Sequence, residues 1–172
     1  MTFLTKTAAA LLILTTAACT NPDRLGGGGL NGQGAAGANA GLSGAASDPS
    51  SPAFFNQTIG DRVLFAVDQS TITPEGRAIL DGQAQWLLAN SDYRAVIEGH
   101  ADEQGTREYN LALGFRRANA VREYLVSRGV PAGRLEVTSY GKERPIEICS
   151  NESCYAQNRR AVTVLSFSAI TS

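Results

Sequence analysis

The chain has 172 residues, of which 43% are hydrophobic and 18% are charged, and its formal net charge is −1 at pH 7. This balance argues against nucleic-acid binding, because neutralising phosphates needs a basic surface. Only four charged residues lie in the first 53 positions, namely Lys6, Asp23, Arg24 and Asp48. Residues 54–172 therefore have the composition and size of one globular domain, and residues 1–53 do not.

Residues 1–18 have the pattern of a secretory signal peptide. Lys6 precedes a short apolar run, Ala8 to Leu14, which cannot span a bilayer as a lasting anchor. The next residue, Cys19, resembles the lipidated cysteine of bacterial lipoproteins, and Thr20 after it resembles an outer-membrane sorting position. The resemblance implies that acyl chains on Cys19 anchor the protein to a membrane leaflet. An ordinary signal peptide followed by a chance cysteine is the alternative.

Residues 19–53 comprise this N-terminus and a linker rich in Gly, Ala, Asn and Ser. Nine of the 18 glycines lie between Gly26 and Gly44, and such a composition cannot bury enough apolar surface to fold. About 35 residues of this kind have an end-to-end distance of roughly 30–35 Å and extend to on the order of 115–125 Å. This reach suits a domain that leaves a membrane surface to find a target. A passive spacer is the alternative.

The first half of the domain predicts a strand followed by a helix. Arg62 to Val67 is a short apolar run rich in β-formers. Thr73 then caps a helix that has Pro74 at its first position and ends near Asn90. Residues at helical spacing form its apolar stripe: Leu80, Ala84, Leu87 and Leu88, widened by Ile79 and Trp86.

The second half predicts three more strands and a second helix. The strands are Tyr93–Gly99, Arg134–Tyr140 and Ala161–Phe167, and the helix runs from its cap, Thr106, to Arg128. The order βαβαββ indicates an α/β (α+β) fold. We expect a two-layer sandwich with two main helices on one face of a four-stranded mixed sheet, with parallel neighbours across the helix connections and an antiparallel last strand.

Two glycines are expected to allow close contacts of the backbone. Gly99 ends the predicted second strand, and Gly114 lies in the second helix, one turn before its apolar stripe.

Cys149 and Cys154 are separated by four residues. In an exported protein such a pair is typical of a disulfide. A loop this short gives a chain-entropy gain of roughly 2–3 kcal/mol at most. A pair of metal ligands is the alternative, but no second Cys or His lies near it in the sequence.

An acidic cluster around one histidine resembles a metal or acid–base site at first. Its members are Glu98, His100, Asp102, Glu103 and Glu108. The chain has only one histidine, however, whereas hydrolytic zinc sites usually contain two or three. No Gly-rich phosphate loop follows a strand either. We therefore expect no catalysis, no metal and no cofactor, and an envelope hydrolase or metalloenzyme is the least favoured hypothesis.

Several separated motifs resemble one known family. Gly99-His-Ala-Asp102 is followed by Tyr109-Asn-Leu-Ala-Leu-Gly-Phe-Arg-Arg-Ala-Asn-Ala-Val121, and later by Ser139-Tyr-Gly-Lys-Glu-Arg-Pro145 and Asn158-Arg-Arg-Ala161. In order and spacing they resemble the OmpA-like peptidoglycan-binding domain over about residues 60–168. Within that family the resemblance is to its peptidoglycan-associated lipoprotein branch, Pal. The Cys149–Cys154 segment is not a general feature of the family.

The resemblance implies noncovalent binding of the meso-diaminopimelate side chain in the peptidoglycan stem peptide. Asp102 matches the family aspartate that pairs with an ammonium, and Arg117 matches the arginine that pairs with a carboxylate. Asp68, Ala101 and Leu113 match positions that line the same pocket. Considered alone, without the resemblance, Arg117 is better interpreted as a helix-surface charge, and Asp102 as a loop or helix-entry acid.

The resemblance also implies a cellular setting and partners. It places the domain in the periplasm on an outer-membrane anchor, as part of the Tol–Pal system that supports envelope integrity and outer-membrane constriction at division. TolB and TolA would be protein partners, with TolB competing for an overlapping surface. The alternative function is an interaction adaptor of the same fold that binds Tol proteins and has an inactive wall site.

Overall fold

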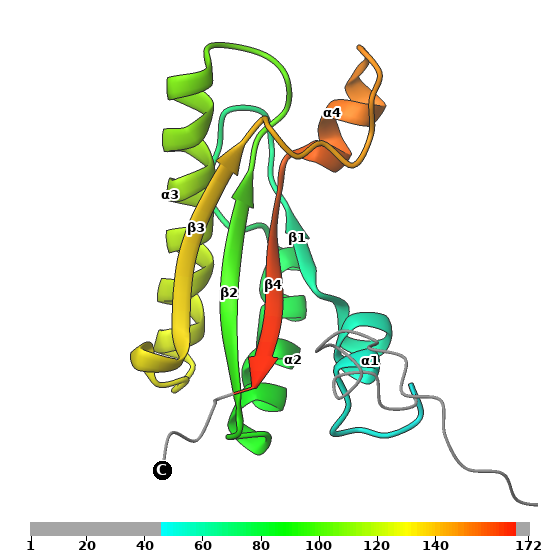
Figure 1. Cartoon of the computed structure of the whole chain (residues 1–172), viewed down its shortest axis with the longest axis vertical. Coiled ribbons are helices and arrows are strands. Elements are labelled where there is room, and N and C mark those ends of the chain that lie inside the picture. The colour runs from blue at the N-terminus through cyan, green and yellow to red at the C-terminus, as the bar shows by residue number, and fades with distance from the viewer. Residues whose placement is uncertain (1–45, 168–172) are drawn as a thin grey trace, which may run out of the picture. The chain divides into compact units, whose positions relative to one another are not determined.

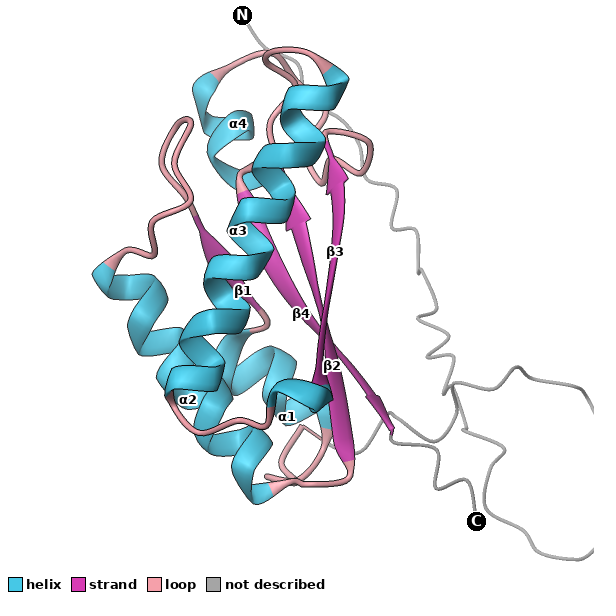
Figure 2. Cartoon of the chain, turned by 90° about the vertical axis from the view of Figure 1, so that its left-hand side faces the viewer, coloured by secondary structure: helices cyan, strands magenta, loops and turns pink. Residues whose placement is uncertain are grey.

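The computed structural model describes residues 46–167 (Figure 1). The signal peptide, Cys19 and most of the predicted linker lie outside the described residues. Within residues 46–167, the predicted architecture is confirmed: helices α2 and α3 lie on one face of a four-stranded mixed sheet (Figures 1 and 2). No helix in this part of the chain is long and apolar enough to cross a membrane.

The sheet has the strand order β1-β4-β2-β3. The last strand, β4, lies between β1 and β2 and runs antiparallel to both, whereas β2 and β3 are parallel neighbours. Within residues 46–167 the one parallel pair is that joined through α3. The expectation that β1 and β2 are also parallel neighbours, across α2, was wrong, because β4 lies between them. The strands are β1 Arg62–Leu64, β2 Tyr93–His100, β3 Leu135–Gly141 and β4 Arg160–Phe167.

Both predicted helix caps are present. The Thr73 hydroxyl accepts a hydrogen bond from Gly76 N at 3.1 Å, and the Thr106 hydroxyl accepts one from Tyr109 N at 3.2 Å. The helices are α1 Pro52–Phe54, α2 Pro74–Ala89, α3 Arg107–Ser127 and α4 Glu152–Asn158, with a π-helical turn over Phe55–Gly60 and a 3-10 turn over Ala132–Arg134.

Strand β1 is shorter than the predicted Arg62–Val67. Phe65 N still donates to Arg159 O at 2.9 Å, but beyond it two backbone carbonyls, of Ala66 and Gln69, accept hydrogen bonds from the side chain of Arg117. These bonds draw the chain away from the sheet edge and into a loop, so side-chain donors from α3 replace a strand partner.

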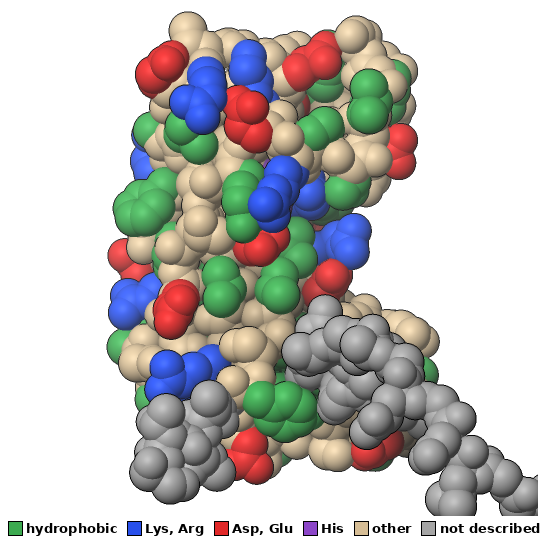
Figure 3. Space-filling view, viewed as in Figure 1, with side chains coloured by type: hydrophobic (Ala, Val, Ile, Leu, Met, Phe, Trp, Pro, Cys, Tyr) green, Lys and Arg blue, Asp and Glu red, His purple; other side chains and the backbone are tan. Residues whose placement is uncertain are grey.

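The core lies between the sheet and the two long helices. Most of the predicted α2 stripe is buried, but Leu88 is 48% exposed, so its assignment to the core was wrong. The central buried residues are Val63, Leu80, Ala84, Leu87, Ile97, Ala118, Val121, Leu125 and Leu135. No helix of residues 46–167 covers the other face of the sheet (Figure 1). Figure 3 shows hydrophobic, basic and acidic side chains interspersed there, and Leu64 and Val164 are among the exposed apolar residues.

Helix α3 contacts β2 backbone to backbone, as the two glycines predicted. A Cβ added to Gly99 would lie 1.8 Å from the carbonyl oxygen of Gly114. A Cβ added to Gly114 would lie 2.4 Å from Ser139 Oγ. Only glycine fits at either position, and this contact fixes where α3 begins relative to the end of β2.

Ordered contacts begin before residue 54. Trp86 Nε1 on α2 donates to Pro49 O at 2.7 Å, and Ser51 is buried. The ring of Phe55 lies 5.0 Å from that of Trp86. Residues 49–53, which the sequence assigned to the linker, therefore pack on α2.

Candidate functional site

A cleft of about 290 Å³ lies between the loop after β1, the loop after β2 and the first turns of α3. The close Gly99–Gly114 contact places the loop after β2 beside the first turns of α3. The cleft is lined by Val67, Asp68, Asp102, Gln104, Gly105, Tyr109, Asn110 and Leu113. Two of these eight side chains are carboxylates and none is cationic, so the lining favours a positively charged group.

Asp102 lines the cleft but is only 8% exposed. Its Oδ1 accepts a hydrogen bond from Gln104 N at 3.2 Å, which shapes the turn after β2. Its Oδ2 lies 3.2 Å from Nη1 of Arg159, itself only 4% exposed. The carboxylate is thus held by two contacts and retains lone pairs for a ligand donor.

Asp68 is on the opposite side of the cleft. Its backbone has φ 58°, the left-handed region, which Asp tolerates better than most residues. Its Oδ1 accepts a hydrogen bond from the Tyr109 hydroxyl, and this bond raises the pKa of that phenol. The first turn of α3 is therefore linked to the loop after β1. Leu113, one helical turn further along α3, is 5% exposed and contributes an apolar wall.

Arg117 is fully buried and does not line the cleft. Its guanidinium donates to three backbone carbonyls: Nε to Gln69 O at 2.8 Å, Nη1 to His100 O at 2.8 Å and Nη2 to Ala66 O at 3.2 Å. Burial lowers its pKa to about 10, while Asp102 and Asp68 oppose that shift, so the group stays charged at neutral pH. It joins the two loops that form the cleft.

The structure therefore brings together three of the five predicted site residues, Asp68, Asp102 and Leu113. Arg117 and Ala101 lie in the buried layer beside the same loops. Ala101 is 2% exposed, and its amide donates to Gly141 O at 2.8 Å.

Sequence reasoning missed six residues of this site. Tyr109 and Asn110 are within the motif that identified the family, and Arg159 is within a later one, so a signal for each was present. The other three, Val67, Gln104 and Gly105, are loop residues with no distinguishing pattern.

The acidic cluster around His100 does not assemble into a metal site in residues 46–167, where no group of three or more His, Cys, Asp or Glu side chains is placed to hold an ion. His100 is 2% exposed, and neither ring nitrogen has a hydrogen-bond partner in this range. Nε2 lies 3.8 Å from Glu98 Oε2. Burial, with Arg160 and Arg144 nearby, lowers the pKa of His100 to about 4.

Comparison with known proteins matches this chain to one family and to lipoproteins that share one name. The model of the OmpA family matches residues 64–159. The chain is 56% identical over 128 residues to a peptidoglycan-associated lipoprotein of Rhizobium meliloti (strain 1021), with 74% of this chain and 73% of that one covered. It is 47% identical over 161 residues to one from Agrobacterium fabrum, with 91% and 85% covered.

Solved structures of similar fold include a protein of the same name. The crystal structure of the peptidoglycan-associated lipoprotein from Burkholderia pseudomallei superposes with a TM-score of 0.63 at 39% identity, covering 70% of this chain and 98% of that one. The C-terminal domain of Helicobacter pylori MotB superposes with a TM-score of 0.59 at 21% identity over 63% of this chain and 86% of that one, which indicates a shared fold alone.

Proposed function

Because this chain belongs to the OmpA family, and within it to the peptidoglycan-associated lipoproteins, we propose that it binds peptidoglycan noncovalently through the diaminopimelate of the stem peptide. The observation that carries the proposal is the position of Asp102. The carboxylate lies in a cleft whose lining has two acids and no cationic side chain. A cleft of this kind suits an ammonium group, which the free end of diaminopimelate carries.

Asp102 receives the ligand ammonium in this proposal, and Asp68 adds a second negative charge across the cleft. Hydrogen bonds between two charged groups are shorter and stronger than neutral ones. The apolar side of Leu113 accommodates the methylene chain between the stem peptide and the ammonium. Ala101 contributes indirectly, because its buried backbone fixes the start of the loop that carries Asp102.

Arg117 takes the ligand carboxylate. Three of its five N–H bonds are donated to backbone carbonyls, which leaves two for a ligand. Since the guanidinium is fully buried, the carboxylate reaches it only after the loop over residues 66–69 shifts, and it then replaces Gln69 O or Ala66 O as an acceptor. Binding therefore includes a rearrangement of that loop, and a bidentate contact with the carboxylate compensates for the bonds lost.

The envelope setting completes the proposal. Acyl chains on Cys19 hold the protein to the outer membrane, residues 20–48 tether the domain, and the domain binds the wall from the periplasm. The system is Tol–Pal, with TolB and TolA as protein partners, and its output is envelope integrity and outer-membrane constriction at division. The role is binding, not catalysis. An adaptor that binds Tol proteins and leaves the wall unbound is the alternative.

Cosedimentation with diaminopimelate-type sacculi tests this function. The full chain in mild detergent is compared with Asp102→Asn, which keeps the shape and removes the charge, and with Asp92→Asn, the same change at an exposed aspartate away from the cleft. The proposal expects the wild type and Asp92→Asn to sediment and Asp102→Asn to stay in solution with an intact fold. If Asp102→Asn sediments as the wild type does, the cleft is not the wall site.

A further inference from the structure

The segment that contains the disulfide contacts the loop that carries Asp102. A disulfide joins Cys149 to Cys154, with the two Cα atoms 6.0 Å apart. Helix α4 begins inside this ring, and Figure 1 shows it at the same end of the sheet as the loop between β2 and α3. The segment and the loop are about 50 residues apart in sequence, yet two separate contacts join them.

The first contact is the buried guanidinium of Arg159, directly after α4. It donates to Asp102 Oδ2 through Nη1 and to Glu152 Oε1 through Nη2. Its Nε donates to Phe65 O at 3.2 Å. One side chain thus connects the cleft carboxylate, the first residue of α4 and the residue that follows β1.

The second contact is made by Glu103, the neighbour of Asp102. Its Oε1 accepts hydrogen bonds from Ser150 Oγ and from the Tyr155 hydroxyl, both at 2.8 Å. These bonds lower the pKa of the Glu103 carboxyl. Outside the segment, Lys142 directly after β3 also holds the loop, since its Nζ donates to Gly105 O at 2.8 Å. The acidic loop is therefore held at its start, middle and end.

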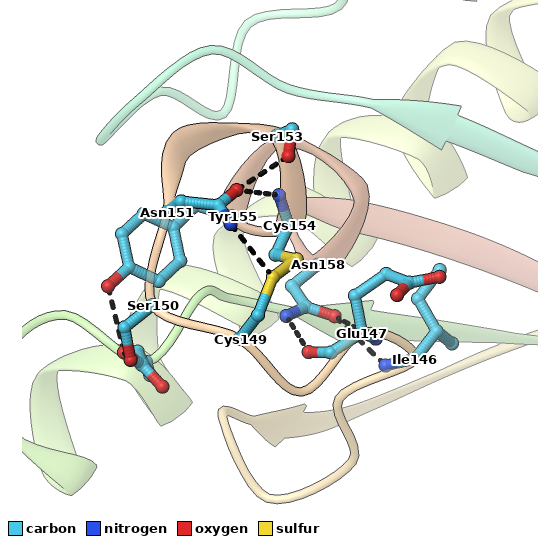
Figure 4. Close-up of a disulfide and its surroundings, with 10 residues drawn as sticks. Ile146, Glu147, Cys149, Ser150, Asn151, Ser153, Cys154, Tyr155 and Asn158 are labelled. Carbon is cyan, nitrogen blue, oxygen red and sulfur yellow. Dashed lines mark hydrogen bonds between the residues drawn. A yellow bond between two sulfur atoms is a disulfide. The ribbon is translucent and has the colours of Figure 1, made fainter.

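The disulfide ring fixes the donors of the second contact. Helix α4 has seven residues, too few to be stable by itself in water. Asn151 caps it by accepting from Cys154 N at 3.2 Å, and Asn158 at its other end binds the backbone of Ile146 and Glu147 (Figure 4). Ser150 lies within the ring and Tyr155 directly follows it, so closing the ring restricts where both hydroxyls point.

We propose that residues 149–159 form a positioning strut for the binding loop, in which Ser150, Tyr155 and Arg159 hold Glu103 and Asp102 in the geometry that takes the ligand. The inference rests on the proposed function, because the loop is the part of the cleft assigned to the ligand ammonium. None of the three is required to touch the ligand. A disulfide that only stabilises the fold is the competing explanation, and it predicts no effect on affinity in a stably folded variant.

The double variant Ser150→Ala/Tyr155→Phe tests the strut, because it removes the two hydroxyls that donate to Glu103 and keeps the carbon atoms of both side chains. Its matched control is Ser127→Ala/Tyr124→Phe, which changes two residues in the last turn of α3, far from the cleft. In the wild type the Tyr124 hydroxyl also donates to a carboxylate, that of Asp81 on α2. Both pairs combine an exposed serine with a half-buried tyrosine. Affinity of the full chain for diaminopimelate-type sacculi, the thermal midpoint and amide hydrogen exchange are measured for each.

The strut variant is expected to bind about threefold to tenfold more weakly than the wild type, with faster exchange confined to residues 101–105 and a thermal midpoint close to that of the control. Cys149→Ser/Cys154→Ser is expected to weaken binding in the same direction. If the wild type binds and the strut variant binds equally well, the strut is overturned while the wall-binding function stands. If the wild type itself fails to bind, the proposed function is overturned and the strut with it.

Discussion

Arg159 Nη1 lies 3.2 Å from Asp102 Oδ2, and both residues are more than nine-tenths buried. The carboxylate that we assign to the ligand is therefore already paired in the free protein. A ligand ammonium has to share it with Arg159, so the site selects a donor that fits the remaining lone pairs and not any cation. Glu152 is the second partner of Arg159 and keeps the guanidinium partly compensated when Asp102 is changed.

Asp102→Asn is expected to lower stability as well as binding. The amide cannot compensate the buried charge of Arg159, and leaving such a group partly unpaired costs about 1–3 kcal/mol. Urea unfolding of Asp102→Asn beside Asp92→Asn measures this cost. Equal unfolding midpoints for the two variants would mean that the Arg159–Asp102 pair contributes nothing to the folded state.

Arg117→Lys is expected to destabilise the domain by about 2–4 kcal/mol, because a single ammonium cannot reach the carbonyls of Ala66, Gln69 and His100 together. The neighbouring Arg116 is exposed, so Arg116→Lys is the matched control and should unfold as the wild type does. Urea unfolding midpoints of the wild type, Arg117→Lys and Arg116→Lys measure the loss of stability. If Arg117→Lys unfolds at the wild-type midpoint, the three hydrogen bonds to backbone carbonyls are not important for stability.

His100 makes stability depend on pH in a defined window. Its pKa is about 4 in the folded protein against an ordinary 6.5, so between these values the unfolded chain binds more protons. The free energy of unfolding therefore falls as pH falls through this range, by about 2 kcal/mol between pH 7 and pH 5. Since the chain has one histidine, His100→Phe should remove this slope. Urea unfolding at both pH values measures it, and an unchanged slope in the variant would refute the assignment.

Gly99→Ala is expected to cost about 3 kcal/mol or more, since its Cβ would lie 1.8 Å from a backbone oxygen of α3 and a backbone cannot give way as a flexible side chain does. Gly133→Ala is the control, because nothing lies within 4 Å of a Cβ added there. Thermal unfolding compares the two. If both alanines are tolerated equally, the close contact of α3 with β2 does not hold the cleft segments together.

The sequence predicted the layers, the helix caps and a close contact at Gly99 and at Gly114, because each depends on local patterns or on glycine alone. It did not predict that these two glycines contact each other. It did not predict the burial of Arg117, since that depends on carbonyls 48 and 51 residues earlier in the chain. Helix α4 was missed because seven residues are too few to show a helical period. Arg159 was visible in a motif, but its partner Asp102 is 57 residues away, so only the folded chain reveals the pair.

The most direct measurement is NMR titration of the labelled chain with two soluble muropeptides, one with meso-diaminopimelate and one with lysine at the same position. Lysine lacks the second carboxylate, so its complex forgoes the charge-assisted contact with Arg117, which is worth about 1–3 kcal/mol. We expect roughly tenfold or stronger preference for the diaminopimelate form, with shifts concentrated at residues 66–69 and 101–113. Equal affinity for both muropeptides, or shifts confined to other parts of the domain, would contradict recognition of diaminopimelate in this cleft.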